Sequence, residues 1–405
     1  MRMSPKIASW PYFDEEQVAV VAEVLRSGKV NYWTGSEGGK FEREYAAHLG
    51  CRYAVALANG TVALELALEA FAIGHGDEIV VPARTYVASA SCAVMRGAVP
   101  IVADVDARSQ CVTAESITAV LTERTRAVIV VHLAGWPADM DPIMDLARKR
   151  GLVVIEDCAQ AHGALYRGRA VGSIGHAGAF SFCQDKIITT GGEGGLLALD
   201  DETAWRRAWA YKDIGRSYAA SFEQEHAPGF RWLTETFGTN WRMTEVQAAL
   251  GRIQLSRLPQ WSARRAQNAS ILRDALRDLP VLRIPEVASG DRHAYYKFYA
   301  FVCPERLLPG WSRDRILAEI EAAGVPCGVG SCSEIYLEKA FVDRGWGPKE
   351  RLPVAKQLGE TSLMFAVHPT LTDGEMREAA QIIRSVVLRA MAQFEHRSTA
   401  QSFLG

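Results

Sequence analysis

The feature that most constrains the fold of this chain is an alternation of short apolar runs with helical segments between residues 53 and 199. The runs expected to be strands are 53–57, 78–81, 99–102, 127–132, 152–156, 179–182 and 196–199. Several of them, such as 127–131, are apolar at every position, which is typical of strands covered on both faces. Strands that alternate with helices favour a parallel sheet between helical layers. The sequence therefore predicts an α/β domain with a mostly parallel central sheet flanked by helices.

The sequence predicts one helix before this stretch and a different rhythm after it. The range 15–28 carries Val18, Val21 and Leu25 on one helical stripe and ends at Gly28, a common helix-terminating residue. After residue 251 come an Arg-rich helical stretch over 258–279, a β-like run over 295–302 and a helical stretch over 313–323. We therefore expect a large α/β domain over 1–250, a smaller α+β domain over 251–393 and a frayed polar tail over 394–405.

Charge and composition exclude several classes of protein. Lys and Arg total 45 against 47 for Asp and Glu, a net charge of −2, so nucleic acid is not an expected partner. The sequence has no apolar run of the roughly 18 residues that a membrane span needs, and no signal peptide, so we expect a cytoplasmic protein. The eight cysteines are scattered without a C-x-x-C pair, which disfavours structural zinc and a disulfide scaffold.

Ligands of open α/β sheets bind at the carboxyl ends of the strands, so the residues that follow each predicted strand are the first candidates for a binding site. Asn59, Gly60 and Thr61 follow the first strand and open the helical segment 62–71. A helix N-terminus offers backbone N–H groups and the positive end of a dipole to a phosphate group. Helix capping without any ligand is the alternative for these three residues.

Two charged residues follow later strands. Asp157 comes after the apolar run 152–155, where a carboxylate needs a cationic or hydrogen-bonding partner, although a helix cap or an ion pair could also explain it. Lys186 comes after the run 179–182, between two largely apolar segments. A partly desolvated lysine has a lowered pKa and is a usable nucleophile toward aldehydes. A lysine that extends its amine to solvent from a loop is the alternative.

An amine, a carboxylate and a phosphate-binding helix end together match what pyridoxal 5'-phosphate (PLP) requires. Tyr86, after the second strand, is available to stack on the cofactor ring. Other motifs do not fit the sequence. The glycines in 191–195 do not spell G-x-G-x-x-G and precede a strand-like run, and no Walker A motif or G-x-S-x-G elbow is present. The histidines lack metal-ligand spacing, so no metal site is expected.

Four segments together resemble the DegT/DnrJ/EryC1/StrS family of nucleotide-sugar aminotransferases. They are Asn59-Gly60-Thr61, Glu156-Asp157-Cys158-Ala159-Gln160-Ala161-His162-Gly163, Ser181-Phe182-x-x-x-Lys186 and Asn240-Trp241-Arg242-Met243-Thr244-Glu245. The resemblance extends over nearly the whole chain. It implies the fold-type I architecture of PLP-dependent transferases, PLP as the cofactor, and a homodimer with active sites at the subunit interface. It also implies transfer of an amino group from L-glutamate to a nucleotide-linked keto sugar.

The resemblance also implies a role for each matching residue. Lys186 would form the Schiff base with the cofactor and carry the proton during transamination. Asp157 would hold the pyridine nitrogen, and Gln160 would contact the ring hydroxyl. The residues implied to bind the cofactor phosphate are Gly60, Thr61 and Ser181, with Asn240 reaching the phosphate of the partner subunit's cofactor.

The segment 189–195, with Glu193, is similar to that of members that aminate C4 of 4-keto-6-deoxy sugars, whereas C3 enzymes tend to carry Asp in its place. This similarity implies C4 of dTDP-4-keto-6-deoxy-D-glucose as the substrate position, for amino-sugar biosynthesis of an O-antigen of lipopolysaccharide or another glycan. The alternatives are C3 amination of a 3-keto sugar nucleotide and a non-catalytic PLP-binding regulator. A sugar dehydratase of this fold is disfavoured, because those enzymes replace the Schiff-base lysine with histidine. Arg216, Arg231 and Arg242 could contact phosphate or carboxylate groups, or could make surface ion pairs.

Overall fold

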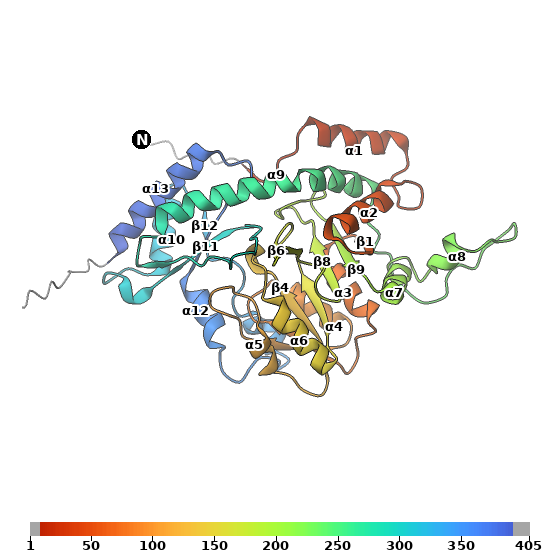
Figure 1. Ribbon diagram of the computed structural model, residues 1–405, viewed down its shortest axis with the longest axis horizontal. Helices are drawn as coiled ribbons and strands as arrows, with labels where there is room; N and C mark the ends of the chain where they lie inside the picture. The colour runs from red at the N-terminus through yellow and green to blue at the C-terminus, as the bar shows by residue number, and fades with distance from the viewer. Residues whose placement is uncertain (1–8, 392–405) are drawn as a thin grey trace, which may run out of the picture.

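The computed structural model describes residues 9–391, and its centre is a seven-stranded sheet (Figure 1). The tail predicted over 394–405 lies outside the described residues. The strand order is β1-β9-β8-β5-β4-β2-β3. The strands are β1 (Tyr53–Leu57), β2 (Glu78–Pro82), β3 (Val99–Ala103), β4 (Thr125–Val131), β5 (Val153–Asp157), β8 (Ala177–Ser181) and β9 (Gly195–Leu199). Within the described chain, β9 alone runs against the other strands of this sheet, so the predicted mostly parallel sheet is confirmed.

Helices flank this sheet, as the alternation of the sequence predicts. Its strands are buried over most of their length because both faces are covered. The helices of this region are α2 (Glu37–Leu49), α3 (Gly60–Ala70), α4 (Ala88–Met95), α5 (Ala114–Thr118), α6 (Met140–Arg150), α7 (Glu202–Lys212) and α8 (Tyr218–Phe222). A short hairpin of β6 (Leu165–Tyr166) and β7 (Arg169–Ala170) follows β5.

A smaller antiparallel sheet, in the order β10-β11-β13-β12, has a hydrophobic core of its own. Its strands are β10 (Leu282–Arg283), β11 (Phe298–Val302), β12 (Cys327–Gly328) and β13 (Ser362–Phe365). The helices of this part are α10 (Arg313–Ala322), α11 (Lys339–Val342), α12 (Pro353–Thr361) and α13 (Asp373–Ala390). The predicted smaller α+β part is therefore present. No helix within residues 9–391 is long and apolar enough to cross a bilayer.

Helix α9 (Glu245–Leu276) joins the two parts and is longer than predicted. The sequence predicts a helix from Thr244 and a helical stretch over 258–279, and the structure joins the two in one helix that begins at Glu245 behind a capping box made by Thr244 and Gln247. It continues through Pro259, which a sequence reading takes as a helix boundary. Residue 251 lies inside this continuous helix, so the domain boundary at 250 and 251 stays a prediction.

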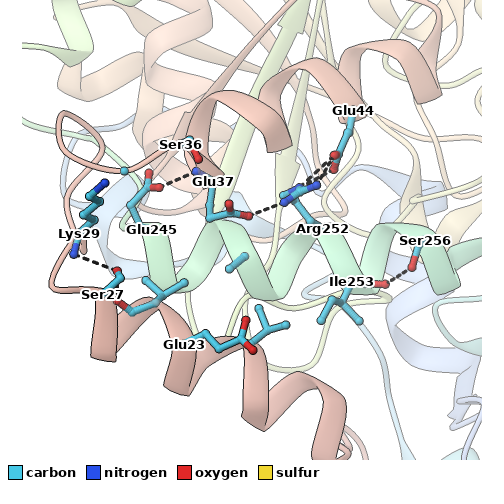
Figure 2. A pocket seen from close by; sticks show the side chains of 14 residues that line it. Glu23, Ser27, Lys29, Ser36, Glu37, Glu44, Glu245, Arg252, Ile253 and Ser256 are labelled. Atoms are coloured by element: carbon cyan, nitrogen blue, oxygen red, sulfur yellow. Dashed lines mark hydrogen bonds and ion pairs between the residues drawn. The ribbon is translucent and has the colours of Figure 1, made fainter.

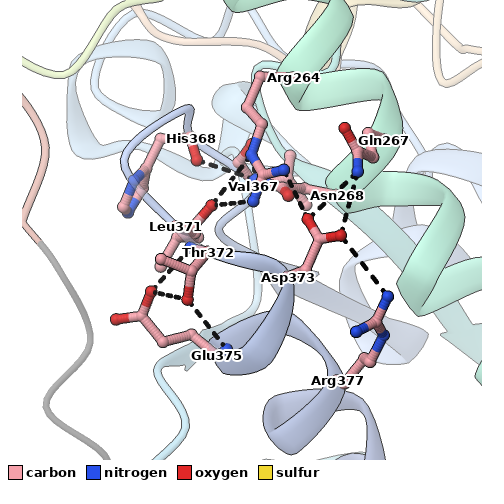
Figure 3. Close-up of polar contacts among 10 residues, drawn as sticks. All are labelled: Arg264, Gln267, Asn268, Val367, His368, Leu371, Thr372, Asp373, Glu375 and Arg377. Carbon is pink, nitrogen blue, oxygen red and sulfur yellow. Dashed lines mark hydrogen bonds and ion pairs between the residues drawn. The ribbon is translucent and has the colours of Figure 1, made fainter.

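The C-terminal half of α9 is tied to α13 and to the segment that precedes it (Figure 3). Asn268, which is fully buried, donates from Nδ2 to the carbonyl oxygens of Val367 at 3.3 Å and His368 at 3.0 Å. Arg264 pairs with Asp373, the first residue of α13, at 2.5 Å. These contacts hold the smaller sheet and its helices against α9.

The predicted N-terminal helix is present as α1 (Glu15–Ser27), but its apolar stripe does not face the core. Val18 is 54% exposed and Leu25 is 59% exposed. Val20 and Val24 instead line a cavity of about 640 Å³ together with α2 and α9 (Figure 2). The stripe therefore indicates the helix correctly, although the covered side of the helix carries Val20 and Val24.

Candidate active site

The first helix turn after β1 forms one end of the site. Asn59 is the N-cap of α3, and its Oδ1 accepts a hydrogen bond from the Val62 amide at 3.0 Å. Gly60 and Thr61 are the first two residues of the helix, and N–H groups in this position point out of the helix end because they lack partners one turn back. A Cβ added to Gly60 would lie 2.6 Å from the Ser181 Cβ, so only glycine allows this approach.

Ser181 ends β8 beside this helix turn, and a buried histidine holds its backbone. The Ser181 carbonyl oxygen lies 2.8 Å from His162 Nε2, and the Tyr45 hydroxyl lies 2.7 Å from His162 Nδ1. A carbonyl can only accept, so Nε2 carries the proton and Nδ1 accepts from Tyr45. Burial lowers the pKa of His162 to about 3, which keeps the ring neutral.

Asp157 is the last residue of β5 and is buried, rather than following the strand as predicted. Its Oδ2 accepts from the Ser89 hydroxyl at 2.8 Å, and the Ser89 hydroxyl lies 2.8 Å from that of Thr85. Its Oδ1 accepts from the Ala159 amide at 3.1 Å. Burial raises the pKa of Asp157, while these hydrogen bonds and Lys186 act in the opposite direction. A buried carboxylate with a raised pKa is stabilised by a cationic partner such as a protonated pyridine.

Lys186 lies in the loop after β8, and aromatic and acidic groups surround its side chain. Its Nζ is 5.1 Å from the centroid of the Tyr296 ring and 3.7 Å from Asp185 Oδ1. The Tyr296 hydroxyl in turn donates a hydrogen bond to the Asp185 carboxylate. Trp10 Nε1 donates to the Lys186 carbonyl oxygen at 2.9 Å, which fixes the backbone of the loop. The amine is therefore held at the carboxyl end of β8 with 17% of its side chain exposed.

Gln160 connects the large sheet to the smaller part of the molecule. Its Oε1 accepts from the Ala134 amide at 2.7 Å, and its Nε2 lies 3.5 Å from the Ser331 hydroxyl. Ala134 has a positive φ of 58°, so the local backbone turns its amide toward Gln160. The amide group of Gln160 is thus fixed by backbone geometry.

The side chains of two further predicted residues are exposed. Tyr86, after β2, is 69% exposed. Asn240 is exposed and pairs as an isolated antiparallel bridge with Asp213, in the segment between α7 and α9.

The donor set fits PLP. An amine, a carboxylate and a helix N-terminus follow or end β8, β5 and β1, which is the edge where open α/β sheets bind ligands. The glycine segment 191–195 serves close packing behind the helix end, since a Cβ added to Gly195 would lie 2.1 Å from the Asn59 carbonyl oxygen. The roles of individual residues toward the cofactor stay predictions.

Sequence reasoning missed several polar residues that support this site. Ser89 binds Asp157 across 68 positions of sequence, and Tyr296 binds Asp185 across 111. No local motif indicates such pairs. Asp185 could have been found, because it directly precedes Lys186.

A buried group of His132, Glu156 and Cys158 lies just behind Asp157, with potential ligand atoms within 4.8 Å of one another. His132 Nδ1 accepts from the Ala138 amide at 3.0 Å, so Nε2 carries the proton and donates to Glu156 at 2.9 Å. The Glu156 carboxylate also accepts from three backbone amides of the segment 172–175. Burial raises the pKa of Glu156, but these hydrogen bonds outweigh it and lower that pKa. The cluster therefore anchors the end of β5.

The cavity beside α1 is lined by none of the site residues described above. Glu245 accepts hydrogen bonds from the amides of Glu37, at 2.5 Å, and Gly38, at 3.0 Å, and so caps the start of α2 (Figure 2). Arg252 joins Glu37 to Glu44. The charges of this cavity join α2 to α9.

A mostly parallel α/β sheet that brings these groups to one edge defines the class of fold-type I PLP-dependent transferases. The sequence profile of the DegT/DnrJ/EryC1/StrS aminotransferase family matches residues 11–384. The chain therefore belongs to this family, and it is a PLP-dependent aminotransferase.

Individual relatives agree with this assignment. The solved structure of the aminotransferase from Psychrobacter cryohalolentis is 55% identical, with a TM-score of 0.94, over 95% of this chain and 99% of that chain. GDP-perosamine synthase from Caulobacter vibrioides is 38% identical over 77% of this chain and 84% of its own length. UDP-N-acetyl-3-dehydro-alpha-D-glucosamine 3-aminotransferase from Acidithiobacillus ferrooxidans is 34% identical over 86% of this chain and 88% of its own length.

Proposed function

We propose that this enzyme transfers an amino group from L-glutamate to a nucleotide-linked keto sugar in amino-sugar biosynthesis. The observation that carries the proposal is the arrangement of Lys186, Asp157 and the N-terminus of α3 at one edge of the sheet. PLP supplies the electron sink that lets an amino group pass between two carbon skeletons. Two relatives are named for sugar-nucleotide substrates or products, which supports a substrate of this kind.

The residues of the chain divide the work. Lys186 would hold the cofactor covalently through Nζ, and the same amine, once released, would move a proton between the substrate carbon and the cofactor carbon. Asp157 keeps the pyridine nitrogen protonated, and Gln160 contacts the ring hydroxyl. Gly60 and Thr61 bind the phosphate through the helix end. Ser181 adds a hydroxyl to the same group, and Tyr86 stacks on the ring.

The proposed acceptor position is C4 of dTDP-4-keto-6-deoxy-D-glucose. The segment 189–195, with Glu193, supports it through its similarity to C4 enzymes. The second candidate is C3 amination of a 3-keto sugar nucleotide, which the name of the Acidithiobacillus ferrooxidans relative favours.

The proposed assembly is a homodimer with shared active sites. The support is Asn240, which is exposed and whose backbone pairs with that of Asp213. Arg216 and Arg242 both approach Asp213, at 3.9 Å and 2.7 Å. Arg231 is exposed, and so it is the arginine of the three best placed to meet a phosphate group of a substrate.

The test is incubation of the purified enzyme with L-glutamate and either dTDP-4-keto-6-deoxy-D-glucose or its 3-keto isomer, with the product determined by NMR. We expect amination at C4 and a shift of the visible cofactor band on adding L-glutamate. Amination of the 3-keto isomer alone would overturn the assignment of C4 as the acceptor position, but it would agree with an aminotransferase activity. UDP- and GDP-linked keto sugars test the nucleotide, and Lys186→Ala, which should abolish turnover, is the control.

A further inference from the structure

Residues 214–241 leave the body of the molecule as a protruding segment between α7 and α9, which we call the arm (Figure 1). The arm carries α8, and Asn240 is its second-last residue. Its large apolar side chains are unusually open to solvent, with Phe230 78%, Trp232 83% and Phe237 99% exposed. Phe222 in α8 stacks on Trp33 and contacts Trp209, which ties that part of the arm to the body. The returning part, which leads to Asn240, is tied to the body at the base of the arm, where the amides of Thr239 and Trp241 donate to carbonyl oxygens of Tyr211 and Lys212.

Asp213 closes the base of the arm and is fully buried. Its Oδ1 accepts from Arg242 Nη1 at 2.7 Å and from Trp33 Nε1 at 3.1 Å. Asp213 precedes the arm and Arg242 follows it, so this ion pair joins the two ends of the segment. The backbone of Asp213 also pairs with that of Asn240.

Buried charges surround this carboxylate on the side of the core. Lys212 is fully buried, with Nζ 3.4 Å from Asp213 Oδ2 and 3.7 Å from the centroid of the Tyr32 ring. The Tyr32 hydroxyl donates to Glu42 at 3.0 Å. Asp213 is thus shared by Lys212 and Arg242. A buried charge without its partner is strongly unfavourable, so a change at Asp213 displaces its neighbours.

The returning end of the arm is joined to the phosphate-binding end of its own sheet. Arg242 pairs with Leu57 as an isolated antiparallel bridge, and the Ala58 amide donates to the Trp241 carbonyl oxygen at 2.9 Å. The base of the arm is therefore registered against β1, one residue before Asn59.

We infer that Asp213 is a positioning residue, which fixes the arm so that Asn240 reaches the cofactor phosphate of the partner subunit. The inference rests on the proposed function, because it needs a homodimer with shared sites. It adds that the side chain acts on the site of the other subunit and not on that of its own chain.

Mixed dimers separate these two possibilities. Chains with Lys186→Ala and with Asp213→Asn are co-expressed with different tags, and the mixed dimer is purified. In it, the site with Lys186 receives the arm of the chain that keeps Asp213. If Asp213 acts across the interface, this site is intact. If Asp213 acts within its own chain, each of the two sites is damaged.

The Asp213→Asn homodimer should bind PLP about tenfold more weakly or worse in a titration of the visible band, while remaining dimeric in sedimentation, because a small displacement of Asn240 suffices. The mixed dimer should recover about half of the wild-type kcat, since one of two equivalent sites is complete. Unchanged PLP affinity in the homodimer, or a mixed dimer no more active than the Asp213→Asn homodimer, would overturn the inference.

Three further variants keep the outcome interpretable. Trp33→Phe removes one hydrogen bond to Asp213 while keeping an aromatic ring, and should weaken PLP binding in the same direction if Asp213→Asn does not fold. Glu223→Gln is the matched control. Glu223 lies on the arm and forms an exposed ion pair with Arg206 of α7, so this variant should leave PLP affinity unchanged. A mixed dimer of Lys186→Ala and Asn240→Ala tests sharing itself. If that dimer does not recover activity, the proposed shared site fails, independently of Asp213.

Discussion

His162 is held in one protonation state by its two neighbours, Tyr45 and the Ser181 carbonyl, and this has a measurable consequence for stability. Its pKa falls from an ordinary 6.5 to about 3 in the folded chain because of burial. In the unfolded chain it takes up a proton near pH 6.5, so the unfolded state binds more protons between pH 6.5 and about 3. Stability contributed by neutral His162 is therefore complete above pH 6.5 and is lost as the pH falls through this window.

We expect His162→Gln to weaken the dependence of unfolding on pH. One histidine contributes up to about 1.4 kcal/mol per pH unit to the fall of the free energy of unfolding. The variant should lose this contribution between pH 6.5 and pH 4, although it is less stable at pH 8. Urea unfolding at a series of pH values measures the slope. A slope equal to that of the wild type would contradict the burial of a neutral ring.

Substitution of Asp157 tests whether the negative charge at this position is needed for turnover. Asp157→Asn keeps the shape of the side chain but removes the charge that we propose holds a protonated pyridine nitrogen, so kcat should fall by about 10²-fold or more. Ser89→Ala is the matched comparison, since it removes one hydrogen bond to Asp157 and keeps the charge. Its effect on kcat should be about tenfold or less. Turnover with glutamate and the keto sugar measures both, and a wild-type kcat for Asp157→Asn would contradict the assignment.

The contacts between α9 and the region of α13 include a buried hydrogen bond and a partly exposed ion pair, so two substitutions can compare their contributions to stability (Figure 3). Asn268→Ala removes the buried donor of the Val367 carbonyl oxygen, while the His368 carbonyl oxygen keeps the Leu371 amide, and this should cost about 1–3 kcal/mol of stability. Asp373→Ala breaks the partly exposed pair with Arg264 and the weaker contacts with Gln267 and Arg377, and should cost about 1 kcal/mol. Urea unfolding of both variants checks the order. A larger loss for Asp373→Ala would show that the ion pair controls the joint.

The elements that sequence could predict are those whose signals are local. The strand order along the chain and the start of α3 follow from apolar runs and from Asn59 as a cap, and both are present. The course of α9 could not be predicted, because Pro259 signals a break that packing on both sides overrides. The covered side of α1 could not be predicted, because the position of α9 and not the apolar stripe decides it.

For the site, too, the residues with a local sequence signal could be predicted and those placed by tertiary packing could not. Gly60, Asp157 and Lys186 could be found because each stands next to the end of a strand, and the sheet brings strand ends together. Ser89 and Tyr296 could not, because their partners are set by tertiary packing alone. Asn240 can be judged only in an assembly, since its implied ligand belongs to another subunit.

The molecule as a whole presents an arm whose aromatic side chains are exposed in a single chain. Phe230, Trp232 and Phe237 lie on this segment, and exposed apolar groups gathered in this way mark an interface. Because a symmetric dimer repeats the same contact twice, the double variant Trp232→Ala and Phe237→Ala should weaken the proposed dimer strongly. We expect the dissociation constant to rise by about 10²-fold, as for the loss of central aromatic contacts.

Dissociation should also release the cofactor, because each site would lose Asn240 of the other chain. Sedimentation velocity over a range of concentrations, recorded at the visible band of PLP, follows mass and cofactor together. Val342→Ala, on α11, is the control, since Val342 is 60% exposed but lies outside the arm. It should leave both the dimer and the band unchanged. A variant or wild-type monomer that keeps its cofactor and its activity at assay concentration would contradict shared sites, because a complete site would then exist in one chain.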